Sequence, residues 1–408
     1  MNHGKSIELI HVVEKENGLP ASFYIVSLAS FLFKLTRNTT QPIFTLYVLE
    51  MGASLVQVGL ILSVQSVLMT VVRIPLTMVA DRIGHNRMIL VAFFIQATAP
   101  ILYAIAPDLS WLYILPFYQI IATGSFNQLA MVIASNMAPA TRQGDTLGRY
   151  MTFMSMGMFV GPIIAGGLVN HIGYRQLFMV SALFPVIGLG LFLGFKPKGV
   201  DAPPAEKALI EEGPGTMAAL KVILRDRNIL ILTFVRAVYS MANTVFTSLF
   251  AVFAVQDLGL TPALTALIYS AVGFSNTFIK FPAGRMADAI GPKKVLFAAF
   301  STVVIVYFAI PYARGALSLL VLLVLFGACW GTRAVTEWST LTNSVNQENK
   351  TIAISYLGSI WGVGATAGSF MVGVVGEAFP FSKIFLMLAL ISLPALPAIY
   401  LMKDPKEV

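Results

Sequence analysis

The sequence predicts an all-α membrane protein with twelve transmembrane helices. Of its 408 residues, 57% are hydrophobic and 11% are charged, whereas soluble domains carry roughly 25% charged residues. Apolar runs of about 20 residues, long enough to cross a hydrocarbon core of about 30 Å, recur along the whole chain. Only helices and closed barrels satisfy the backbone in lipid, and the sequence lacks the short alternating segments of a barrel.

Hydropathy and basic residues together predict the topology. If the N-terminus lies inside, the cytoplasmic segments hold 18 Lys and Arg residues and the outer loops hold three. This bias places both termini in the cytoplasm and the chain in the plasma membrane. The expected spans are 21–49, 55–79, 88–106, 111–137, 148–170, 176–195, 228–255, 263–283, 295–312, 316–343, 352–377 and 383–402.

The residues for enzymatic or metal chemistry are missing. Cys329 is the single cysteine, and the four histidines are scattered without ligand spacing. There is no catalytic triad and no phosphate-binding loop. We therefore expect no cofactor, no metal and no enzyme activity, with an ion gradient as the energy source. The net charge of +8 reflects membrane topology rather than nucleic-acid binding.

The chain contains two copies of one unit. A polar segment, 196–227, separates an N-terminal half, 1–195, from a C-terminal half, 228–408. A gapless shift of 207 residues places Ala-Asp-Arg-Ile-Gly at 80–84 on Ala-Asp-Ala-Ile-Gly at 287–291. The shift predicts two six-helix halves in parallel orientation with a pathway between them, and 196–227 as a cytoplasmic linker.

Two loops carry a family resemblance. Residues 77–87 read Thr-Met-Val-Ala-Asp-Arg-Ile-Gly-His-Asn-Arg, and 284–294 read Gly-Arg-Met-Ala-Asp-Ala-Ile-Gly-Pro-Lys-Lys. Both resemble the signature loop of the major facilitator superfamily, Gly-x-Leu-Ala-Asp-Arg-x-Gly-Arg-Lys, although Thr77 replaces the first glycine. The resemblance implies the major facilitator fold and an inner gate that breaks as the halves rock; a basic topogenic loop is the alternative. The expected gating residues are Asp81, Arg82, Gly84, Asp288, Gly291 and Lys293.

The fifth span contains small residues at close spacing. Gly157-x-x-x-Gly161-Pro162-x-x-Ala165-Gly166 resembles a motif of the twelve-helix drug:proton antiporters in the same superfamily. Its glycines permit close helix contact and its proline bends the helix. A general packing patch is the alternative, while the resemblance favours export. The arginine that such antiporters carry in span 4 is absent from this sequence.

Polar residues concentrate in spans 1, 4, 7 and 10, which the resemblance assigns to the central cavity. Lys34, Arg37 and Arg236 have no evident carboxylate partner. Because an intramembrane base costs roughly 2.5–3.5 kcal/mol, we hypothesise that these three meet an anionic group of the substrate. The full expected substrate-binding set is Lys34, Arg37, Gln41, Gln119, Asn127, Arg236, Asn243 and Arg333.

Glu337 is the clear mid-span acid, one helical turn after Arg333. A carboxylate in low dielectric is suited to carry a proton, which predicts Glu337 as the proton-coupling residue. A static ion pair with Arg333 is the alternative. The aromatic residues Trp330 and Trp361 are expected to form either a binding wall or ordinary packing.

These observations predict a monomeric secondary transporter in the lipid bilayer, working by alternating access. We expect it to export a small organic solute, anionic or amphiphilic, in exchange for protons. Uptake or exchange of an organic anion is one alternative. A membrane sensor that has the transporter fold and carries no flux is the other.

Overall fold

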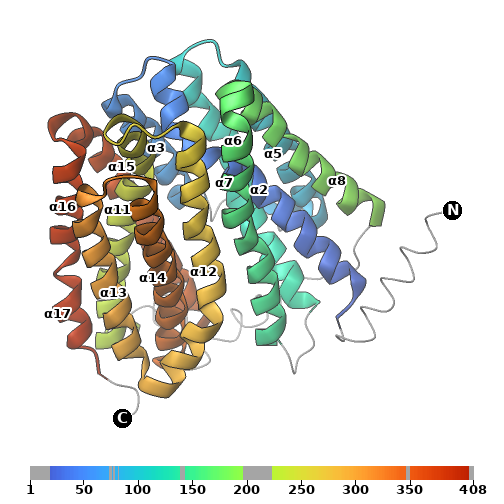
Figure 1. Ribbon diagram of the computed structural model, residues 1–408. Helices are drawn as coiled ribbons and strands as arrows, with labels where there is room; N and C mark the ends of the chain where they lie inside the picture. The colour runs from blue at the N-terminus through green and yellow to red at the C-terminus, as the bar shows by residue number, and fades with distance from the viewer. Residues whose placement is uncertain are drawn as a thin grey trace.

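The computed structural model describes residues 19–72, 76, 79–80, 82–137, 143–195, 223–345 and 350–403. Within these ranges the chain forms helices and short connections, with no strand. Figure 1 shows a bundle in which the helices of the first half, blue to green, stand beside those of the second, yellow to red. The expected linker lies mostly outside the described residues.

The helices before residue 196 begin with Ala21 and end with Phe195. The long α7 breaks at Gly173, where φ is 77° and ψ is 175°. The two parts of α7, together with α8, therefore cover the fifth and sixth expected spans. The bounds are α2 Ala21–Glu50, α3 Leu55–Val71, α5 His85–Ile105, α6 Leu109–Asn136, α7 Gln143–Ser181 and α8 Leu183–Phe195.

The helices after residue 222 follow the same order. Eight helical segments of the described chain are long and apolar enough to cross a membrane. The middle of α2, which is not among the eight, carries the polar stripe of Lys34, Arg37 and Gln41. The bounds are α11 Arg227–Gln256, α12 Pro262–Ile290, α13 Pro292–Ala309, η2 Ile310–Tyr312, α14 Ala316–Asn343, α15 Lys350–Ala378, α16 Phe381–Ser392 and α17 Ala395–Tyr400.

Four helices of the second group begin exactly one repeat length after their counterparts. The N-cap residues also match, because Ser54 caps α3 and Thr261 caps α12, each accepting from a backbone N–H in the first turn. Gly84 and Gly291 precede α5 and α13 with φ of 93° and 94°, a conformation that favours glycine. The matched starts are Leu55 and Pro262, His85 and Pro292, Leu109 and Ala316, and Gln143 and Lys350.

The halves pack together mainly through two helix pairs: α3 packs against α15, and α7 packs against α12. A Cβ on Gly59 would lie 2.5 Å from the backbone nitrogen of Gly373, and a Cβ on Gly166 would lie 2.7 Å from the carbonyl oxygen of Ala263. Gly166 and Gly373 are equivalent under the repeat. Glycine is required at these places because only a bare backbone allows the helices to approach so closely.

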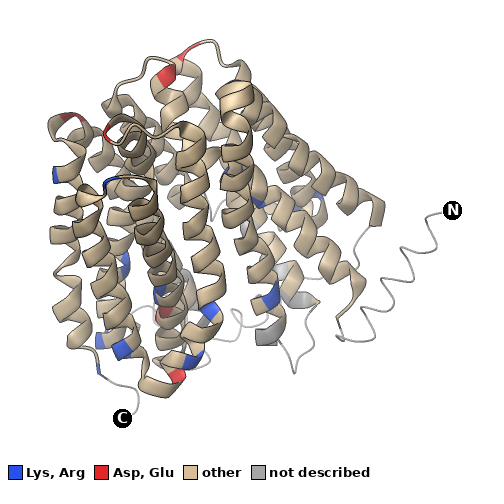
Figure 2. Ribbon diagram, viewed as in Figure 1, with Lys and Arg blue, Asp and Glu red and all other residues tan. Residues whose placement is uncertain are grey.

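The two ends of the bundle differ in charge. We call them the Glu50 end, which holds the turn after α2, and the Gly84 end, which holds the turn before α5 and the last described residue, Lys403. Figure 2 shows most of the blue Lys and Arg in its lower part, toward the C-terminus, and most of the red Asp and Glu in its upper part. Such a bias along the bundle is typical of a membrane protein with its basic end in the cytoplasm.

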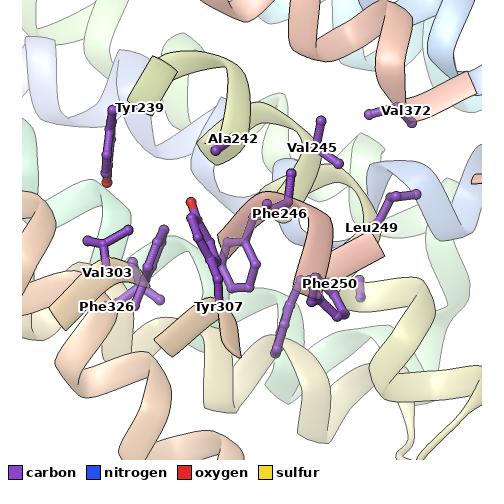
Figure 3. Close-up of a cluster of buried hydrophobic side chains, with 14 of the residues drawn as sticks. Tyr239, Ala242, Val245, Phe246, Leu249, Phe250, Val303, Tyr307, Phe326 and Val372 are labelled. Atoms are coloured by element: carbon purple, nitrogen blue, oxygen red, sulfur yellow. The ribbon is translucent and has the colours of Figure 1, made fainter. Parts of the chain in front are cut away.

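The hydrophobic core is shared at one end and divided at the other. One cluster runs along the second half, from Phe250 to Ile399, and at the Glu50 end it also contains Tyr47, Ile61 and Phe178 from the first half. Figure 3 shows the part of this cluster around Tyr239, Phe246 and Tyr307. A second cluster, at the Gly84 end, contains only first-half residues among those that the structure describes. The halves are thus packed together at the Glu50 end.

Candidate functional site

A cavity of about 360 Å³ lies between the halves. Its walls come from α2, α3, α5, α6 and α7 on one side and from α11, α14 and α15 on the other. Of the expected substrate-binding residues, Arg37, Gln41, Gln119 and Asn243 line it. These four residues come from spans 1, 4 and 7, whose polar residues were expected to line one cavity.

Among the described residues that line the cavity, Arg37 is the only charged one, and there is no Lys, Asp or Glu. Its side chain is exposed to the cavity. Among the described residues no carboxylate lies within ion-pair distance of its guanidinium group. A base of this kind at membrane depth favours an anionic ligand.

The two tryptophans of the cavity form an aromatic wall on α14 and α15. The rings of Trp330 and Trp361 both line the cavity and are nearly parallel, with 6.3 Å between centroids and 13° between planes. Phe44 and Phe178 contribute aromatic surface from the first half. Trp330 and Trp361 therefore provide a flat apolar surface beside polar groups, which is the usual composition of a small-molecule site.

Polar groups complete the lining. The hydroxyl of Tyr103 donates to Oε1 of Gln119 at 3.4 Å. Asn243 is 4% exposed, and its Oδ1 has no hydrogen-bond partner among the described residues. A buried amide oxygen without a partner is uncommon in proteins, so Asn243 is available for a ligand.

Arg236, Arg333 and Glu337 form a buried cluster, which we call the ion triad. Arg236 donates from Nη1 to Oε2 of Glu337 at 2.9 Å, and Arg333 donates from Nη1 to Oε1. The sequence-based expectation that Arg236 lacks a carboxylate is wrong, because α11 and α14 bring it to Glu337. The pair of Arg333 with Glu337, one of the two alternatives, is present.

The ion triad lies behind the aromatic wall rather than in the described lining. The guanidinium carbons of Arg236 and Arg333 lie 5.8 Å and 5.7 Å from the ring centroid of Trp361. The guanidinium carbon of Arg236 also lies 4.7 Å from the ring centroid of Trp338, and that of Arg333 lies 3.9 Å from the ring centroid of Tyr239. These cation–π contacts stabilise the buried charges and connect the triad to the cavity wall through Trp361.

Two other expected binding residues are not in the described lining. Lys34 lies beside α7, because its Cβ is 3.7 Å from where a Cβ on Gly157 would be. Asn127 lies in α6, and its side chain is outside the described residues.

The expected gating residues that the structure describes lie at the Gly84 end. Arg82 and Asp288 are exposed, and Asp288 has no ion pair with any residue that the structure describes. Lys293 contacts the ring of Tyr400 at 5.2 Å. Asp81 lies outside the described residues, so a latch between the signature loops stays a prediction.

The small residues of the fifth span face two neighbours. Gly157 and Gly161 lie against α2, where a Cβ on Gly161 would approach the backbone of Asn38 to 2.5 Å. Gly166 lies against α12, and Pro162 is inside α7. This segment therefore contacts both the cavity helix α2 and the opposite half.

Sequence reasoning missed the polar residues of α3 and α15. Gln65, Ser66 and Ser369 line the cavity, and Ser66 and Ser369 share a hydrogen bond of 3.1 Å between the halves. Lys280 also bonds across the halves, donating from Nζ to Oγ of Ser155 at 2.8 Å. The signal was present as serine, threonine and glutamine within otherwise apolar spans, but we had assigned the cavity to spans 1, 4, 7 and 10.

The fold and the cavity define the class of this protein as a membrane transporter. The chain matches the sequence profile of the Major Facilitator Superfamily over residues 26–332 and 232–408. It therefore belongs to the major facilitator superfamily and is a transporter rather than an enzyme.

Curated relatives are transporters as well. The multidrug resistance protein MdtG of Yersinia enterocolitica is 22% identical over 377 residues, covering 91% of this chain and 90% of the relative. The multi-drug resistance efflux pump PmrA of Streptococcus pneumoniae is 25% identical over 365 residues, covering 86% and 89%. The riboflavin transporter RibZ of Clostridioides difficile is 22% identical over 372 residues, covering 80% and 78%.

Solved structures share the fold at low identity. A bacterial homolog of the human lysosomal transporter Spinster, crystallised in an inward-facing and unoccupied conformation, has a TM-score of 0.79 and 14% identity. That match covers 93% of this chain and 96% of the other. The nucleoside transporter NupG has a TM-score of 0.75 and 13% identity, with 94% and 100% covered.

Proposed function

We propose that this protein is a proton-coupled exporter of a small organic anion. The observation that carries the proposal is Arg37, a guanidinium group in the cavity between the halves, with no carboxylate in the described lining. The names of the MdtG and PmrA relatives favour export, and that of RibZ shows that a relative moves a nutrient-sized organic solute.

The proposed topology has twelve spans, with both termini in the cytoplasm of a plasma-membrane monomer. The halves are 1–195 and 228–408, joined by the linker 196–227. The basic Gly84 end is then cytoplasmic. Because the halves share a cluster at the Glu50 end, and the first half has a cluster of its own at the Gly84 end, we assign the structure to the inward-facing state.

In this mechanism the solute enters from the Gly84 end and is held by Arg37, Gln41, Gln119 and Asn243. The helix pairs α3–α15 and α7–α12 rock about their glycine contacts. The signature loops then meet at the Gly84 end through Asp288 and the basic residues near it, which closes the inner gate.

We propose Glu337 as the group that couples protons to this cycle. It is the one buried carboxylate among the described residues. Both of its oxygens accept from arginines in this state, so proton binding requires at least one guanidinium group to move away. The ion triad would then have one arrangement in each of two states, as a coupled transporter requires.

The test is flux of organic solutes in inverted membrane vesicles, where export appears as accumulation. With an acidic vesicle interior, we expect proton-dependent accumulation of an organic anion in vesicles that contain the protein and none in empty-vector vesicles. Loss of preloaded anion from the vesicles under the same gradient would reverse the direction to uptake. Absence of flux for anions, cations and neutral solutes would overturn the proposal.

A further inference from the structure

The cavity has positive charge on both sides. From the first half, Arg37 contributes a guanidinium group without a carboxylate partner among the described residues. From the second half, the ion triad contains two guanidinium groups and one carboxylate, a net charge of +1 behind Trp361. Charges act strongly in low dielectric. A cationic ligand between these two positive groups would be repelled, whereas an anion would be attracted by both.

The shape of the second-half wall is flat and aromatic. Trp330 and Trp361 lie nearly parallel along the cavity. The guanidinium groups of Arg236 and Arg333 also lie near the ring of Trp361. Aromatic faces favour other aromatic rings through large contact area and offset stacking. A planar ring system is therefore favoured over a branched aliphatic group.

A further polar contact is available beside this wall. Asn243 is 4% exposed, lines the cavity, and has an Oδ1 without a partner among the described residues. It offers an acceptor for a donor on the ligand. The cavity volume of about 360 Å³ is near the lower end of the roughly 300–1,000 Å³ that ligand pockets span. The ligand is therefore of one or two rings rather than a large drug.

We propose that the substrate is a small planar aromatic anion, whose negative group binds Arg37 and whose ring lies against Trp330 and Trp361. This rests on the proposed function, since it names the substrate class of the same cavity. It separates the protein from exporters whose substrates are cationic drugs, because no carboxylate of the described lining would hold such a cation.

Calorimetric binding to purified protein at neutral pH tests the proposal with three matched probes. These are 2-naphthoate, 2-naphthylmethylammonium and cyclohexanecarboxylate: an aromatic anion, an aromatic cation of the same ring, and a non-aromatic anion. We expect 2-naphthoate to bind at least tenfold more tightly than the other two. Equal or tighter binding of the cation, equal binding of the non-aromatic anion, or no binding of 2-naphthoate would each overturn it.

Variants assign the preference to named side chains. Arg37→Gln should remove the discrimination between naphthoate and the naphthyl cation, and Arg37→Lys should restore part of it. Trp330→Leu should reduce the discrimination between the aromatic and non-aromatic anions. Arg314→Gln and Trp111→Leu, both exposed and outside the described cavity lining, are the matched controls. If the controls lose as much affinity as the cavity variants, or if the cavity variants lose none, the assignment is wrong.

Counterflow in proteoliposomes distinguishes this inference from the proposed function. Counterflow of the naphthyl cation without that of 2-naphthoate would overturn the substrate class and leave transport intact. Tight binding of 2-naphthoate without counterflow of any of the three probes would support the ligand preference of the cavity and contradict transport. The absence of both binding and counterflow would overturn both.

Discussion

The guanidinium group of Arg236 on α11 lies 2.9 Å from Oε2 of Glu337 on α14. This contact joins two helices that are far apart in the sequence and both border the central cavity. Because Arg333 binds the other oxygen of Glu337, the carboxylate is fully occupied by two bases. The buried charges of the second half therefore form one unit, and its balance depends on a single acid.

Replacement of Glu337 by Gln should destabilise the protein strongly. The change leaves two buried guanidinium groups without their counter-ion, and breaking a buried pair costs about 3–5 kcal/mol. Denaturant or thermal unfolding of the purified protein measures this loss. Glu50→Gln, at an exposed helix end, is the control and should change stability little. A stability of Glu337→Gln equal to that of the control would show that the triad is not an energetic unit.

Proton coupling can be tested in a variant that keeps the net charge of the triad, with counterflow as the control for folded protein, because Arg236 also loses its carboxylate partner. The double change Arg333→Gln and Glu337→Gln removes one base and one acid, and Arg236 keeps the net charge of the triad at +1. We expect this variant to retain counterflow and to lose accumulation driven by a proton gradient. If the gradient still drives accumulation, Glu337 is a structural ion-pair residue and does not carry the proton.

The glycine contact between α3 and α15 should control which end of the bundle is closed. A side chain at Gly59 would overlap the backbone of Gly373, which cannot rotate away as a side chain does. Gly59→Val should therefore push the halves apart at the Glu50 end. Spin labels on cysteines at positions 50 and 257, in a Cys329→Ser background, should report a longer distance. Gly167→Val, where a Cβ meets nothing within 4 Å, should leave the distance unchanged.

The hydrogen bond from Lys280 to Ser155 should stabilise the contact between α7 and α12. Ser155→Ala leaves a half-buried ammonium group without its acceptor, at a cost of about 1–3 kcal/mol. Ser155→Thr keeps the hydroxyl and should retain most of the stability. Thermal unfolding of the two variants provides the measurement. Similar melting temperatures for the two would mean that the hydroxyl makes no contribution.

The sequence predicted the fold more fully than the site. The 207-residue shift is visible in the structure, because four helices of the second half begin 207 residues after their counterparts in the first. Gly84 and Gly291, which the same shift relates, also share a positive φ angle. Repeats and apolar length are local properties of a chain, so they are readable without coordinates. Helix periodicity placed Arg37 and Gln41 on one stripe, and the family resemblance implied that this stripe and Asn243 share the central cavity, as they do.

Contacts between helices were less predictable because they depend on rotation and crossing of whole helices. Arg236 was expected to be without a carboxylate, yet packing of α11 on α14 brings it to Glu337. Lys34 belongs to the same helical stripe as Arg37, but the close approach of Gly157 places it near α7. Lys280 was not among the expected site residues, yet packing of α12 on α7 lets it donate to Ser155 of the opposite half.

The central claim is that the cavity between the halves is the site through which the solute passes. Protection of a cysteine at Thr40 tests it most directly, because Thr40 lines the cavity and, among the described residues, bonds only to backbone carbonyls of its own helix. Thr152→Cys, with the same kind of bond but on an exposed surface, is the control. In a Cys329→Ser background we expect 2-naphthoate to slow thiol labelling of Thr40→Cys several-fold, and labelling to block counterflow. Labelling of Thr40→Cys that is insensitive to 2-naphthoate, or that leaves counterflow intact, would contradict the account.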